Sequence, residues 1–166
     1  MIAWEERPVE VANLLNPAFC ALLLRGAVLE YAKATPTGGM DLPLAFMVLP
    51  IVLHKATREA LPKTTISKFH IWFQEHQELR IGFLSRVQQQ APFTRESLQF
   101  AMQRGTLALN DHGLLVAPKY KFKKVDQALV SLEMQYCLDR ATFLGKWLGA
   151  AGSASQVLSA WGLTLR

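Results

Sequence analysis

The sequence predicts a mainly α-helical fold with a winged-helix-like region, and three neighbouring patterns support this. Over 79–87, apolar residues recur at the spacing of one face of a helix. After a break at Pro92, residues 95–104 predict a second helix that ends at a glycine. Two short apolar runs around the polar turn 110–113 then predict a β-hairpin. A helix, a turn, a helix and a hairpin occur in this order in a winged helix.

These patterns divide the chain into an N-terminal helical region (1–78), a winged-helix-like region (79–124) and C-terminal helices (125–166). We expect the three to form one compact unit, because 166 residues are enough for one domain with a substantial core. Apolar residues make up 51% of the chain, which excludes a disordered protein. Four Trp and nine Phe also suggest that partner proteins cover part of the surface.

Prolines and capping residues mark the helices of the N-terminal region. Asn16 can cap a helix that starts at Pro17, because its side chain can accept a backbone N–H of the first turn. Asp41 can cap a very apolar helix over 42–53, which Pro50 kinks or splits. The first region is therefore expected to supply much of the core.

Similar signals mark the later helices. Thr94 can cap the second helix of the winged-helix-like region. Asp126 can cap a long helix that runs to about Leu148, and Ser153 can cap a short last helix.

The apolar stretches do not suggest a membrane protein. The run from Ala18 is interrupted by Arg25 and Glu30, and the run over 42–53 is shorter than the roughly 20 residues that span a bilayer. No signal peptide is visible at the N-terminus. We expect a cytoplasmic protein without membrane contact, in which Cys20 and Cys137 are buried reduced thiols.

No pattern of residues predicts catalysis, a metal site or a cofactor site. The chain has no nucleophile elbow, Walker sequence, dinucleotide fingerprint or HExxH motif. Its four histidines lack a second ligand at zinc spacing, and its acidic residues form no convincing catalytic pair. We therefore expect a protein that is not an enzyme.

A basic stretch after the predicted hairpin is the best candidate for nucleic-acid contact. In a strand, Lys119, Lys121 and Lys123 would lie on one face, and Lys124 adds another cation. The alternative is an edge strand whose lysines face water and discourage aggregation. Arg95, on the predicted recognition helix, is a further candidate, but acidic residues accompany it there. Protein docking is therefore the favoured use of this region.

Several segments of the first two regions resemble a known family. They are Asn13–Phe19, Leu42–Lys55 with Thr57 and Arg58, and the pattern from Phe93 through Gly105. Together they are similar to the middle component of three-component ABC systems, over roughly residues 8–117.

The resemblance implies a small bacterial subunit that acts with an SMC-like ABC ATPase and an effector, often a nuclease. The Lamassu anti-phage and anti-plasmid systems belong to this class. A middle component is expected to bridge the ATPase heads to the effector without catalytic residues of its own. The resemblance implies that contact with DNA occurs mainly through the whole complex.

Five residues are candidates for partner contact within this interpretation. Asn16 and Pro17 belong to the matching motifs, and His54, Lys55 and Arg58 form a polar cluster after a very apolar helix. The alternative for the cluster is a solvated helix end, where cations meet the negative end of the helix dipole.

Two other functions remain open. A stand-alone winged-helix regulator would bind DNA tightly and in a salt-sensitive way through the lysines of 119–124. An enzyme with an unrecognised site would reveal itself by a bound metal or cofactor.

Overall fold

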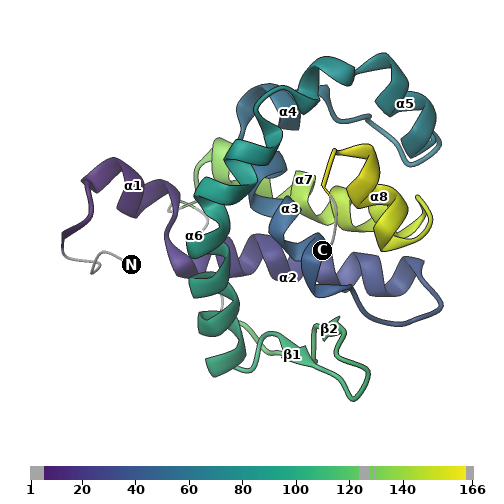
Figure 1. Ribbon diagram of the computed structural model, residues 1–166. Helices are drawn as coiled ribbons and strands as arrows, with labels where there is room; N and C mark the ends of the chain where they lie inside the picture. Colours follow the sequence, from purple (N-terminus) through teal and green to yellow (C-terminus); the bar gives the residue numbers. More distant parts are fainter. Residues whose placement is uncertain (1–5, 124–127, 129, 164–166) are drawn as a thin grey trace.

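Two long helices form the centre of the computed structural model, which describes residues 6–123, 128 and 130–163. Helices α2 (Pro17–Ala34) and α7 (Leu132–Gly149) pack closely against each other along their lengths (Figure 1). Gly145 makes this approach possible, because a Cβ atom there would lie only 2.0 Å from the carbonyl oxygen of Ala27. The core therefore starts from a glycine-mediated helix pair.

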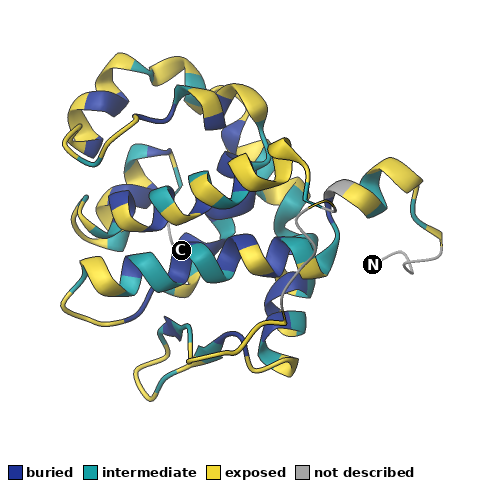
Figure 2. Cartoon of the chain, turned by 180° about the vertical axis from the view of Figure 1, so that it is seen from behind, coloured by how far each residue is buried: buried dark blue, intermediate teal, exposed yellow. Residues whose placement is uncertain are grey.

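Helices α3 (Leu42–Val52) and α6 (Phe83–Gln103) complete the core, and each contacts α2. Most of α3 is buried, including Pro50, which lies inside the helix without splitting it. One cluster of buried side chains joins all three predicted regions, for example through Leu24, Leu98 and Leu148. Figure 2 shows these buried residues on the inner faces of the helices.

Aromatic residues hold α5 (Phe69–Glu75) against α7, and the end of α8 (Ala154–Ala160) against α5. The Trp147 ring lies edge-on to Phe69 and Trp72, at centroid distances of 5.2 and 5.1 Å. Trp161, at the end of α8, contacts Phe73 at 4.8 Å. Such edge-to-face pairs add to the stabilisation that comes from burying the rings.

The predicted helix-turn-helix is wrong. A 3₁₀ turn, η2 (Gln77–Arg80), precedes one continuous helix, α6, which runs through Pro92. Thr94 does not cap a new helix, since its hydroxyl donates a hydrogen bond to the Gln90 carbonyl within α6. A proline inside a helix costs about 3 kcal/mol. The packing of α6 on both α2 and α3, which buries Phe83 near one end and Ala101 near the other, offsets that cost.

The predicted β-hairpin is confirmed. Strands β1 (Ala108–Leu109) and β2 (Leu115–Val116) pair antiparallel. Leu115 also forms a bridge to Met40, with reciprocal backbone hydrogen bonds of 2.8 Å. The hairpin is thus tied to the loop before α3 and lies beside the lower end of α6 in Figure 1.

The remaining helices are short or shifted from the prediction. Helix α1 (Val9–Leu14) stands off the body, and α4 (Lys55–Ala60) follows α3 directly (Figure 1). Helix α7 begins at Leu132 because the Ser131 hydroxyl caps it, accepting the Met134 N–H at 3.1 Å. The cap predicted at Asp126 lies outside the described residues.

By length and composition, the helical stretch Val9–Ala34 passes a test for a membrane span. A buried core helix passes the same test. In this structure α2, which makes up most of the stretch, packs on α3, α6 and α7.

Candidate functional site

A mostly apolar hollow of about 450 Å³ opens where α1, the start of α2, the α3–α4 junction and the start of α7 meet. Its walls combine apolar side chains with a polar rim, and the lining residues are Glu10, Asn13, Asn16, Phe19, Leu53, Lys55, Arg58, Glu133, Met134 and Cys137. We call this the α1–α7 hollow. It brings together three of the five predicted partner-contact residues: Asn16, Lys55 and Arg58.

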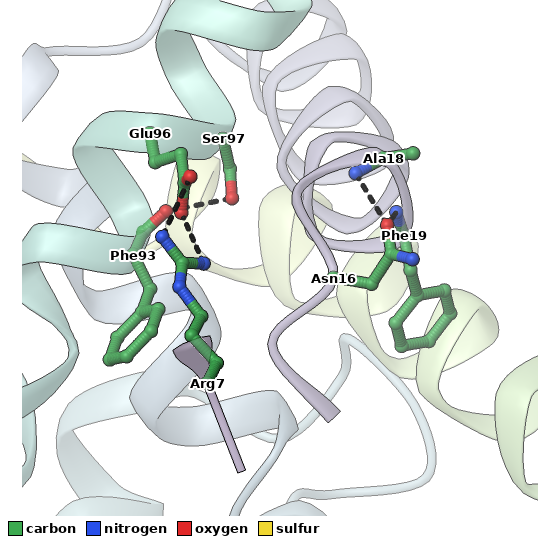
Figure 3. Close-up of polar contacts among 7 residues, drawn as sticks. All are labelled: Arg7, Asn16, Ala18, Phe19, Phe93, Glu96 and Ser97. Atoms are coloured by element: carbon green, nitrogen blue, oxygen red, sulfur yellow. Dashed lines mark hydrogen bonds and ion pairs between the residues drawn. The ribbon is translucent and has the colours of Figure 1, made fainter. Parts of the chain in front are cut away.

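Asn16 and Pro17 shape the edge of the hollow by starting α2. The Asn16 side-chain oxygen accepts the backbone N–H of Ala18 at 2.9 Å, which confirms the predicted cap (Figure 3). Pro17 occupies the first turn, where its missing N–H costs nothing. Pro17 itself does not line the hollow, so its contribution here is to direct the chain.

Arg7, just before α1, anchors this part of the chain to α6. The Arg7 guanidinium forms a two-pronged ion pair with Glu96 of α6, at 2.8 and 2.9 Å, and lies over the Phe93 ring (Figure 3). Bidentate pairs of this kind fix geometry as well as charge. Helix α1 therefore leaves the body from a defined point beside the hollow.

His54 and Lys55 lie at the start of α4, and they differ in exposure. The unprotonated Nδ1 of His54 accepts the Thr57 N–H at 3.3 Å and so caps the helix. Burial, with the charges of Arg86 and Arg58 nearby, lowers the pKa of His54, which favours this neutral form. Lys55 is exposed on the rim of the hollow, and its only ion pair among the described residues is a long one to Glu59, at 3.9 Å.

Arg58 is buried, with 3% of its side chain exposed, although the sequence predicts a surface contact. Its guanidinium donates to the Val52 carbonyl at the end of α3, at 2.8 Å, and pairs with Glu133 at the start of α7. It also lies over the Tyr136 ring at 5.5 Å. Arg58 therefore ties three helices together at the base of the hollow, and any contact with a partner would involve a residue already used inside the protein.

The apolar part of the hollow was missed by sequence analysis. It is formed by residues of α2, the end of α3 and α7, which no pattern within one segment links: Phe19, Leu53, Met134 and Cys137. One local signal was available, because Leu132 begins α7 with 91% of its surface exposed. An apolar residue so exposed at a helix start suggests a surface that a partner covers.

Both cysteines are buried thiols without a disulfide, as predicted. Burial raises the pKa of Cys20 to about 12 and also raises the pKa of Cys137. At pH 8 roughly one Cys20 in ten thousand would be a thiolate, which is the reactive form.

We expect a thiol reagent such as DTNB to label neither Cys20 nor Cys137 in the native protein and both in denaturant. Rapid labelling of the native protein would contradict this.

The predicted nucleic-acid candidates lie in two places. Lys119, Lys121 and Lys123 are exposed on the segment after the hairpin, which forms no strand, so the strand expected there is wrong. Lys124 lies outside the described residues. Arg95 lies on α6 over the Phe46 ring, at 5.9 Å, and lines no hollow with the three lysines.

Within the described part of the chain, no group of three or more His, Cys, Asp or Glu side chains is arranged to hold a metal ion. Outside the His54 cap, His70 contacts the Ala151 carbonyl at 3.1 Å and His76 the Trp72 carbonyl at 2.8 Å. These histidines have structural partners.

A comparison with known protein families gives a match over most of the chain. The family model for the ABC-three component (ABC-3C) system Middle Component 3 matches residues 4–165. No curated protein and no solved structure matches. The match extends over the C-terminal helices, which the sequence motifs could not assign. It covers nearly the whole chain, and this protein therefore belongs to the Middle Component 3 family of ABC-three component systems.

Proposed function

We propose that this chain is a non-enzymatic middle subunit that bridges an SMC-like ABC ATPase to an effector, such as a nuclease, in a cytoplasmic defence complex of the Lamassu type. The match of the family model over residues 4–165 is the observation that carries the proposal. A middle component of a three-component system implies partner subunits. The anti-phage or anti-plasmid role, the type of ATPase and the effector extend beyond that match.

The α1–α7 hollow is the surface that best suits a partner. Phe19, Leu53 and Met134 provide apolar walls, and Lys55 and Glu10 provide charges of both signs on the rim. Stable interfaces combine such an apolar centre with a polar edge. We propose that an apolar side chain of a partner subunit inserts here, while polar groups beside it pair with the rim.

Affinity purification tests the bridging role. The tagged chain, expressed in its native host, should recover an ABC ATPase and an effector in stoichiometric amounts, as identified by mass spectrometry. Recovery of the chain alone with DNA would reject the bridging subunit in favour of a stand-alone regulator.

Met134→Glu tests the hollow. The substitution places a second carboxylate beside Glu133 in an apolar wall, and a bound partner would have to take it out of water. We expect the recovery of at least one partner to fall by about tenfold or more, as for a residue central to an interface. Ile71→Glu is the matched control, because Ile71 is also apolar, lies exposed on α5 and does not line the hollow. Equal recovery by both variants would exclude this hollow as the interface.

A stand-alone DNA-binding regulator is the second candidate, favoured by the exposed lysines of the segment after the hairpin. It is weaker because its recognition helix was expected to be a separate element, and residues 95–103 are instead part of the long α6. It predicts that the isolated chain binds duplex DNA tightly.

A further inference from the structure

A basic groove runs along the face of the protein where segment 117–123 lies against α2. Two adjoining hollows form it, of about 340 and 640 Å³, and both are lined by Tyr120 and Lys121. The first extends to Leu22 of α2 and Arg104 at the end of α6, and the second to Arg25 of α2. We call the two together the 117–123 groove.

We propose that the 117–123 groove binds single-stranded nucleic acid. This proposal does not depend on the bridging role, since the groove and the α1–α7 hollow have no lining residue in common.

The charge of the groove favours a polyanion. Five cations line it, and no described lining residue is acidic; the cations are Arg25, Arg104, Lys119, Lys121 and Lys123. None of the three lysines forms an ion pair with a residue that the structure describes. Unpaired cations concentrated in a groove attract phosphates along a strand.

The two arginines are held in position by local contacts. Arg25 donates to the Pro118 carbonyl at 2.9 Å and lies over the Phe122 ring at 5.5 Å. Arg104 lies over the Phe100 ring at 5.3 Å. The Arg25 contacts fix segment 117–123 on α2. Neither guanidinium group has a carboxylate partner among the described residues.

The aromatic residues favour a single strand over a duplex. Tyr120 and Phe122 alternate with the lysines, are 42% and 48% exposed, and have ring centroids 4.7 Å apart. Bases stack on such rings when they are free of a partner strand, whereas a duplex hides the faces of its bases. A purely acidic protein segment would make no use of the rings.

The simpler explanation for alternating lysines, protection of an exposed strand edge, does not fit. That explanation requires a β-ladder whose edge needs protection. Residues 117–123 form no strand, and the hairpin ends at Val116.

The test is fluorescence anisotropy of the full chain with labelled oligo(dT), and with a duplex of the same length, over a series of KCl concentrations. We expect the single strand to bind more tightly, with affinity falling as salt rises. Lys119→Gln, Lys121→Gln and Lys123→Gln together should weaken binding at least tenfold and reduce the salt slope by about two, at roughly 0.7 per lost phosphate contact. Tyr120→Ala with Phe122→Ala should weaken single-strand binding by about tenfold and leave the slope unchanged.

The matched control replaces three exposed lysines outside the groove, Lys63, Lys68 and Lys146, by Gln and should leave binding within about twofold. Thermal melts of all variants check the fold. Three results would overturn the proposal. The first is that the chain does not bind oligo(dT), and the second is that the control variant loses as much affinity as the groove variant. The third is that the duplex binds as tightly as the single strand and its affinity does not change when the two rings are removed. Competition by polyglutamate as effective as by oligo(dT) would also overturn it, since the groove would then suit an acidic protein segment.

Discussion

Gly145→Ala is expected to lower the free energy of unfolding by about 3 kcal/mol or more, or to prevent folding. An added Cβ would lie 2.0 Å from the carbonyl oxygen of Ala27 and 2.7 Å from that residue's carbonyl carbon. Both atoms belong to the backbone of α2, which cannot rotate away as a side chain could. The α2–α7 pair would have to separate, and overpacking of a core costs about 1–3 kcal/mol even where side chains can adjust.

Urea unfolding monitored by tryptophan fluorescence measures this effect, and Gly26→Ala is the matched control. Gly26 lies on the same helix pair, but an added Cβ there would lie 3.1 Å from the Thr142 hydroxyl, a side chain. Alanine also favours a helix over glycine by about 1 kcal/mol, so the control should remain within about 1 kcal/mol of the wild type. If Gly145→Ala matched the control, the close packing of α2 and α7 would be wrong.

Arg58→Met is expected to lower the free energy of unfolding by about 2–3 kcal/mol. Methionine keeps much of the apolar bulk but leaves the Val52 carbonyl without its donor, and a buried polar group without a partner costs about 1–3 kcal/mol. The stacking on Tyr136 is lost as well. The Glu133 carboxylate adds little, because its side chain is 68% exposed and can return to water.

Two controls separate these contributions in the same unfolding assay. Glu133→Gln removes the ion pair and should cost less than about 1 kcal/mol. Lys55→Ala removes the exposed neighbour of Arg58 and should cost about 0.5 kcal/mol or less. If Arg58→Met lowered the free energy of unfolding as little as Lys55→Ala, Arg58 would be better described by the alternative given above, a charged residue on a solvated helix end. A normal fold with lost partner recovery would instead assign Arg58 to the interface.

The parts of the fold that follow local rules could be predicted. Asn16 and Ser153 cap α2 and α8 because a side-chain oxygen and two or three following residues suffice to form a cap. The hairpin follows from two apolar runs around a turn, in which the Asn110 side chain accepts the His112 and Leu114 N–H groups.

The candidate site could be predicted only in part. Polar residues and a motif single out Asn16, Lys55 and Arg58, which line the α1–α7 hollow, and their role in partner contact stays a prediction. The apolar wall of the α1–α7 hollow was not predicted, since Phe19, Leu53 and Met134 come from segments far apart. In the basic groove, Lys119, Lys121 and Lys123 could be recognised as a charged run, but Arg25 and Arg104 joined them only through folding.

The sequence by itself therefore determined the helical fold class, the caps at Asn16 and Ser153, the hairpin and the middle-component family. The predicted cap at Asp41 is wrong, because α3 starts there without a capping hydrogen bond from the Asp41 side chain. Only the tertiary structure decided that α6 continues through Pro92 and that Arg58 is buried. In both cases a local preference, for a helix break or for hydration of a charge, competes with contacts to distant helices. Packing on α2 and α3 outweighs the first preference, and hydrogen bonds to α3 and α7 outweigh the second.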